Sequence, residues 1–184
     1  MEYKNRAYPR FSACGLNCGL CPRYYTKGGS RCPGCAGEGF SAVHPPCGVL
    51  SCAQRRGYEY CFECAEFPCQ KYDGADATDS FITHKNQMRD LEEAGRIGMV
   101  AYAAVLDEKV KMLERLLRDY DDGRRKSFFC TAVNLLDLED VQAVVARLDG
   151  EIAPGQPAKT KAATAAGLFG QMADERGVCL KLRK

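Results

Sequence analysis

Ten of the chain's twelve cysteines lie between Cys14 and Cys69. The same span contains nine glycines and five prolines, but only five large aliphatic side chains. So few apolar side chains cannot offset the conformational entropy that is lost when such a segment becomes ordered. Thiolates are the only other groups present in number. We therefore expect this span to be held together by bound metal or by covalent cross-links.

The cellular location decides between these two alternatives. The segment Met1–Phe11 carries charges and lacks the apolar stretch of a secretory signal peptide. No run approaches the roughly 18 consecutive apolar residues of a membrane-spanning helix. We therefore expect a cytoplasmic protein with no membrane association. A reducing cytosol disfavours disulfides and favours metal-bound or catalytic thiols.

Three Cys-x2-Cys pairs in this span have the spacing of zinc knuckles. Two residues between cysteines allow a tight turn to direct both sulfurs at one tetrahedral ion, and zinc accepts four thiolates in closed structural sites. The sequence therefore predicts about two zinc ions. The candidate metal ligands are Cys14, Cys18, Cys21, Cys32, Cys35, Cys47, Cys52, Cys61, Cys64 and Cys69.

The grouping of these ligands stays open at this point. A division in chain order gives two sets of four, namely Cys18, Cys21, Cys32 and Cys35 for one zinc and Cys47, Cys52, Cys61 and Cys64 for the other. It leaves Cys14 and Cys69 spare. A cross-braced pairing, or a site that uses Cys14 or Cys69, fits the spacing equally well. His44 is either a further ligand or an ordinary loop histidine.

Other cysteine chemistries compete with zinc. Iron–sulfur clusters use the same thiolates. The spacing Cys14-x3-Cys18-x2-Cys21 matches that of radical S-adenosylmethionine enzymes, but Leu20 replaces their usual aromatic residue and the chain lacks their βα alternation. The pair Cys32 and Cys35 could exchange a disulfide, but no βαβ pattern surrounds it.

The rest of the sequence contains no constellation of catalytic residues. GxSxG, HExxH and phosphate-loop motifs are absent. The formal net charge is only +2, which disfavours a nucleic-acid partner. We therefore expect a zinc-binding protein that acts as a non-enzymatic binding or adaptor module, with an unidentified partner, for which a protein is the first candidate. The alternative is an iron–sulfur or thiol redox protein.

The composition changes after Cys69 and indicates two folded parts. We expect a lead-in over residues 1–13, a cysteine-rich metal-binding module over 14–72 and a helical domain over 80–184. The fold class is a small α+β protein, in which an irregular zinc-stabilised module precedes a mainly helical part that ends in a short strand. The alternating residues Val178, Leu180 and Leu182 predict this strand.

Hydrophobic periodicity predicts the helices of the downstream part. Asp79 or Ser80 can cap a helix that carries Phe81 and ends near Gly95. Apolar residues then repeat every three or four positions from Met99 to Tyr120, with a break at Asp107 as an alternative. Further helices are expected over 127–136, after the cap at residue 137, and over 159–175.

The cysteine pattern resembles the DUF3795 family of small cysteine-rich bacterial and archaeal proteins. The resemblance covers about residues 12–72 and rests on Cys14-Gly15-Leu16-Asn17-Cys18-Gly19-Leu20-Cys21, Cys32-Pro33-Gly34-Cys35, Cys52-Ala53 with Gly57, and Cys61-Phe62-Glu63-Cys64 followed by Phe67-Pro68-Cys69. It implies metal binding without an established activity. The ligands implied are Cys14, Cys18, Cys21, Cys32, Cys35, Cys52, Cys61, Cys64 and Cys69, whereas Cys47 matches the pattern less strictly.

Overall fold

The computed structural model describes residues 3–75, 77–153 and 155–184. The chain forms two compact units, of which unit 1 extends to Ala104 and also includes Leu182–Lys184, while unit 2 comprises Val105–Lys181. The division falls inside helix α4 (Met99–Asp119). The domain limits expected from the sequence, 14–72 and 80–184, stay a prediction.

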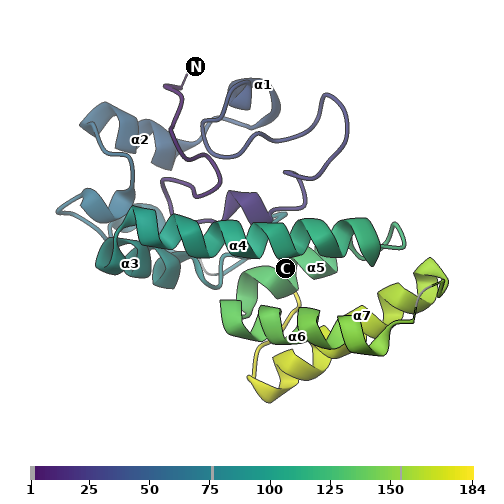
Figure 1. Ribbon diagram of the computed structural model, residues 1–184. Coiled ribbons are helices and arrows are strands. Elements are labelled where there is room, and N and C mark those ends of the chain that lie inside the picture. The colour runs from purple at the N-terminus through teal and green to yellow at the C-terminus, as the bar shows by residue number, and fades with distance from the viewer. Residues whose placement is uncertain (1–2, 76, 154) are drawn as a thin grey trace. The chain divides into compact units, whose positions relative to one another are not determined.

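The described residues form α-helices and 3-10 helices and contain no strand (Figure 1). The α+β class and the strand at Val178, Leu180 and Leu182 are therefore wrong. A strand needs a neighbour that completes its ladder of hydrogen bonds. Here the N–H of Val178 donates instead to the carbonyl oxygen of Ala173, at 2.8 Å, as the helix before it ends.

Unit 1 is mostly irregular and is interrupted by short helices. These are η1 (Cys18–Leu20), α1 (Phe40–Val43), α2 (Gly48–Arg56), η2 (Cys61–Glu63), η3 (Gln70–Tyr72) and α3 (Gln87–Ile97). Cys47 is the N-cap of α2, and its sulfur accepts a hydrogen bond from the N–H of Leu50 at 3.5 Å. The cysteine-rich part thus has little regular structure, as its glycine and proline content predicts.

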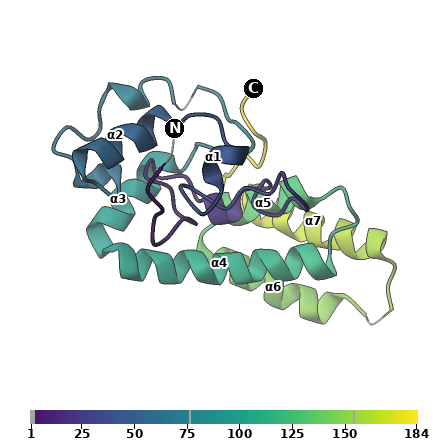
Figure 2. The ribbon, with the colours of Figure 1, turned by 90° about the horizontal axis from the view of Figure 1, so that it is seen from above.

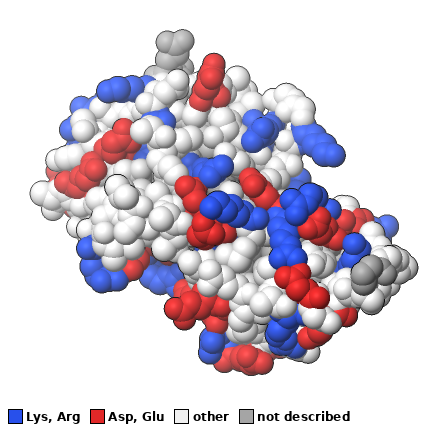
Figure 3. Space-filling model, in the orientation of Figure 1, with Lys and Arg blue, Asp and Glu red and all other residues white. Residues whose placement is uncertain are grey.

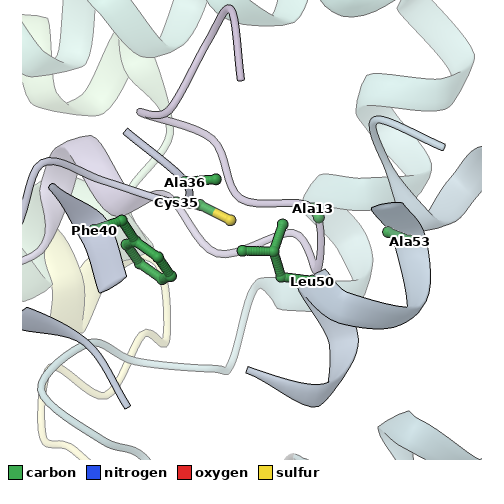
Figure 4. Packing of buried hydrophobic residues seen from close by; sticks show 6 residues of the cluster. All are labelled: Ala13, Cys35, Ala36, Phe40, Leu50 and Ala53. Carbon is green, nitrogen blue, oxygen red and sulfur yellow. The ribbon is translucent and has the colours of Figure 1, made fainter. Parts of the chain in front are cut away.

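A small apolar cluster forms the centre of the cysteine-rich part, and thiols belong to it. Its buried members are Ala13, Cys35, Ala36, Phe40, Leu50 and Ala53, and Figure 4 shows the Cys35 sulfur directed into it. Cys18, Cys32 and Cys47 are partly buried and pack against it. Much of this small core therefore consists of thiols and alanines, which bury less apolar surface than larger aliphatic side chains.

The expected helix start at Asp79 or Ser80 is wrong, because α3 begins only at Gln87. Phe81 lies outside the helix and its exposed fraction is 64%. The side chain of Asp79 is fully buried and accepts hydrogen bonds from the N–H of His84 and the N–H of Arg183, both at 2.7 Å. The Arg183 guanidinium also lies 3.0 Å from this carboxylate. Asp79 therefore anchors the last residues of the chain within unit 1.

We expect Asp79→Asn to lower the free energy of unfolding at pH 7 by about 2 kcal/mol, since the Arg183 charge loses its counter-ion. Burial raises the pKa of Asp79, but its hydrogen bonds from Arg183 and His84 lower it by more. A lowered folded-state pKa stabilises the fold above the ordinary carboxyl pKa of about 3.9, and this stabilisation disappears as the pH falls through the folded-state value. Urea unfolding should therefore show a smaller difference between the variant and the wild type near pH 3.

The exposed Asp73 provides the matched control for this substitution. Asp73→Asn should leave the unfolding midpoint within about 0.5 kcal/mol of the wild type at both pH values. A deficit in Asp79→Asn that does not shrink in acid would contradict the ionic origin of the effect.

Unit 2 is helical and has an ordinary apolar core. Besides the larger part of α4, from Val105 onward, it contains α5 (Lys126–Leu135), α6 (Leu138–Glu151) and α7 (Ala158–Glu175). Helices α6 and α7 pack against each other and lie side by side in Figure 1, and Figure 2 shows the same helices from above. Phe129 and Phe169 are fully buried and meet edge to face, with ring centroids 6.1 Å apart. Hydrophobic burial of this kind needs no metal.

The helices that the sequence predicted after residue 98 are confirmed. Helix α4 is continuous, so the alternative break at Asp107 does not occur, and Leu116 is buried in it. Asp137 is the N-cap residue of α6. Among the described residues, no helix has the length and hydropathy of a membrane-spanning segment.

Candidate metal centre

Two groups of cysteines lie within unit 1. The first thiol group consists of Cys18, Cys21, Cys32 and Cys35, which lie on two Cys-x2-Cys turns joined by a backbone hydrogen bond. The second thiol group consists of Cys52, Cys61, Cys64 and Cys69, which line one cavity of about 570 Å³. Cys47, which the division in chain order put in this set, does not line the cavity, and the grouping of the ligands into metal sites stays a prediction.

Two turns carry the first thiol group. The N–H of Cys21 donates to the carbonyl oxygen of Cys18 at 3.1 Å, which closes the first Cys-x2-Cys turn. The N–H of Cys32 donates to the carbonyl oxygen of Arg23 at 3.0 Å and so joins the second pair to the first. Burial raises the pKa of Cys21, and the nearby backbone N–H groups of Arg23 and Tyr24 oppose this. Such donors favour a thiolate over a thiol.

Asn17 fixes the start of the first turn from a distance. Its side-chain amide donates to the Asp90 carboxylate at 2.7 Å, and its carbonyl oxygen accepts from the Tyr102 hydroxyl at 3.0 Å. Asn17 and Asp90 are buried, and the Tyr102 side chain also packs on Phe11 with ring centroids 4.6 Å apart. None of these positioning residues was identified from the sequence, because no local spacing connects residue 17 with residues 90 and 102.

The surroundings of the first thiol group disfavour isolated thiolates. Burial raises the pKa of Cys18 well above its usual range, and the neighbouring thiolates raise it further. Burial also raises the pKa of Cys35 to about 11, although the Arg6 charge and a backbone hydrogen bond oppose this. A bound cation would stabilise all four thiolates at once, as metals do for coordinating thiols. The donor set therefore suits a thiolate-bound metal.

The second thiol group lies in a more open setting. The walls of its cavity include Tyr58, Phe67 and Tyr72. Burial raises the pKa of Cys61 to about 11, while a hydrogen bond with the Tyr72 hydroxyl acts in the opposite direction. Nη1 of Arg56 donates to the Cys64 sulfur at 3.4 Å. These contacts with sulfur could not be read from the cysteine spacing.

Cys14 lies between the two groups. Its charge acts on Cys18 and Cys35 of the first thiol group and on Cys61 of the second. Its sulfur lies 3.1 Å from the Ser12 hydroxyl, and its carbonyl oxygen accepts from the Gln87 amide at 2.9 Å. Of the two cysteines left over in chain order, Cys69 thus lines the cavity of the second thiol group, whereas Cys14 acts on both groups.

The remaining candidates lie elsewhere. Cys47 interacts with Cys14 and Cys35 from the N-terminus of α2. His44 is exposed and stacks on Phe40, with ring centroids 4.4 Å apart. All twelve cysteines lie in the described part of the chain, and no disulfide joins any of them.

The sulfur positions do not by themselves define a metal site. In residues 3–75, 77–153 and 155–184, no three side chains of Cys, His, Asp or Glu are grouped so that they could hold an ion. The ten predicted ligands therefore stay a prediction. Two observations support metal binding. The first is the chemistry of the two thiol groups. The second is the buried Arg6 cation beside the first thiol group, which suits negatively charged thiolates and whose Nη2 lacks a hydrogen-bond partner among the described residues.

Comparison with known proteins finds one family. Residues 10–74 match the model of a family described as "Protein of unknown function (DUF3795)". This range contains all ten predicted ligands and ends before α3. No curated protein and no solved structure matches the chain.

Proposed function

Since residues 10–74 of this chain are a DUF3795 region, we propose that the protein binds zinc through its two thiol groups and that the ions hold this region in its fold. The observation that carries the proposal is the pairing of two Cys-x2-Cys turns in the first thiol group, which the hydrogen bond from the N–H of Cys32 to the carbonyl oxygen of Arg23 holds together. Binding would draw the four sulfurs of each group to a common point, as tetrahedral zinc requires.

Zinc suits the composition of this region. Its small cluster of alanines, thiols and two large apolar side chains offers little hydrophobic stabilisation. Structural zinc supplies folding free energy directly and brings no redox chemistry. We assign to the folded region a role as a cytoplasmic binding or adaptor module for a protein partner. In support, acidic and basic side chains are interspersed over the face drawn in Figure 3, which does not favour nucleic acid.

One observation favours a second candidate, an iron–sulfur cluster in the second thiol group. The cavity of about 570 Å³ is much larger than a single ion needs, and four cysteines line it. The Arg56 guanidinium donates to one of their sulfurs. Hydrogen bonds to sulfur are among the features that set the potential of such clusters.

Elemental analysis of protein purified without oxygen separates these functions. About two zinc ions per chain in a colourless protein support the zinc proposal. Iron, acid-labile sulfide and an absorption band near roughly 400 nm support the cluster. Protein that is isolated without metal, and that takes up neither zinc nor iron when these are added back, would overturn both.

Single substitutions assign the ions to the two groups. We expect Cys32→Ser and Cys64→Ser each to lose about one metal equivalent, because each removes a thiolate from a different group. Cys179→Ser is the matched control, since Cys179 lies outside unit 1, and it should keep both ions. Mass spectrometry under native conditions measures the count directly. Equal losses in all three variants would contradict two separate groups.

A further inference from the structure

Arg6 is a buried cation beside the first thiol group and precedes the part of the chain that matches the family. The exposed fraction of its side chain is 2%. Its N–H donates to the carbonyl oxygen of Ala36 at 3.1 Å, and the N–H of Cys35 donates to the carbonyl oxygen of Pro9 at 2.9 Å. The segment from Arg6 to Pro9 therefore lies directly along the turn that carries Cys35.

This close approach depends on Gly34. A Cβ atom at this position would lie 2.3 Å from the Pro9 carbonyl oxygen, and its φ of +89° disfavours other residues. The segment from Arg6 to Pro9 can therefore lie against this turn only because residue 34 is glycine.

The guanidinium is only partly satisfied by its neighbours. Nη1 donates to the carbonyl oxygen of Phe11 at 2.7 Å, and Nε contacts the Glu59 carboxylate at 3.1 Å. The guanidinium carbon lies 4.5 Å from the centre of the Tyr60 ring. Nη2 is buried and has no hydrogen-bond partner among the described residues. A buried donor without a partner is costly, and more so when it belongs to a charged group.

We propose that Arg6 is a positioning residue of the metal centre, whose buried guanidinium beside the Cys35 turn offsets the negative charge of the metal-bound thiolates of the first thiol group. The inference rests on the proposed metal binding. Zinc bound by four thiolates carries a net negative charge, which in a buried site needs compensation. Cys35 is the thiolate concerned, because backbone hydrogen bonds join Arg6 to Ala36 and Cys35 to Pro9.

The test compares Arg6→Met with Glu59→Gln. If Arg6 had only a structural role, both substitutions would weaken zinc binding. Arg6→Met removes the charge and is expected to weaken zinc binding by roughly 10- to 100-fold, as the loss of an outer-shell partner does. Glu59→Gln keeps an acceptor for Nε but removes the negative charge that competes for Arg6. It should leave zinc affinity unchanged or raise it. Arg6→Lys, which keeps the charge, should fall between Arg6→Met and the wild type.

Affinity is measured on the full chain by competition with a chromophoric zinc chelator. All variants carry Cys61→Ser and Cys64→Ser, so that the signal comes from the first thiol group. Arg31→Met is the matched control, because Arg31 lies next to Cys32 but is exposed. Its charge is screened by solvent, and its loss should change affinity by less than about threefold.

The outcomes separate this inference from the proposed function. If Arg6→Met and Glu59→Gln weaken binding equally, or if Arg6→Met binds as the parent does, Arg6 has no electrostatic role and the inference is wrong while zinc binding stands. If the wild-type chain takes up no zinc, both fail. Weaker binding in Arg6→Met together with unchanged or tighter binding in Glu59→Gln supports the inference.

Discussion

Gly15→Ala is expected to lower the free energy of unfolding of unit 1 by about 3 kcal/mol or more, because overpacking and an unfavourable backbone conformation add together. Gly15 has a φ of +92°, in the region that favours glycine. A Cβ atom there would lie 2.4 Å from the carbonyl oxygen of Gln87 and 2.5 Å from Cγ of Leu91. Both atoms belong to α3, and one is backbone, so the helix itself would have to move.

The position of Gly15 extends the effect to the metal centre. It follows Cys14 and precedes Asn17, whose amide orients the first turn through Asp90 of α3. A displaced α3 would therefore also disturb the first thiol group. We expect Gly15→Ala to bind about one metal equivalent less than the wild type, as measured by native mass spectrometry.

Gly28→Ala is the matched control for this substitution. Gly28 has a φ of +78°, but no atom lies within 4 Å of its Cβ position. The substitution should therefore lower the free energy of unfolding by only about 1 kcal/mol, the cost of placing alanine at a positive φ. Urea unfolding of the two variants separates that term from the steric one. Similar losses in both would show that contact with α3 does not restrict residue 15.

The sequence predicted the helices of unit 2 well, because an apolar face that repeats every three or four residues determines both the helix and its buried side. It failed where the structure depends on distant partners. Alternation at Val178, Leu180 and Leu182 resembles a strand, but nothing local shows whether a second strand is present. The local sequence predicts Asp79 as a helix cap, whereas its actual partners include Arg183, 104 residues later and near the C-terminus.

The candidate site shows the same limit. Spacing alone identified the Cys-x2-Cys pairs, since two intervening residues make a turn whatever the rest of the chain does. It could not place Cys69 with Cys52, because that depends on how η2 and α2 pack around the cavity. Arg6 and Asn17 gave no signal either. Their roles arise from contacts with residues that lie far away in sequence, such as Glu59 and Asp90.

Removal of the metal is expected to unfold the cysteine-rich region and leave the helices of unit 2 folded. Structural zinc contributes about 10–16 kcal/mol in small zinc-binding modules, which is as large as the whole stability of a typical domain. Between Cys14 and Cys69 few large apolar side chains are fully buried, among them Leu20 and Leu50. In unit 2, by contrast, Phe129 and Phe169 belong to an extensive buried core. The two regions should therefore respond differently to a chelator.

Hydrogen exchange on the full chain, with and without a strong zinc chelator, measures this difference. Protection should be lost over residues 14–72 and kept in α5, α6 and α7. Adding zinc back should restore protection from hydrogen exchange. Adding magnesium instead should not, because magnesium prefers oxygen ligands. If protection over 14–72 survives the loss of all metal, the apolar cluster around Leu50 and Phe40 is sufficient for folding. The ions would then have a role other than stabilising this region.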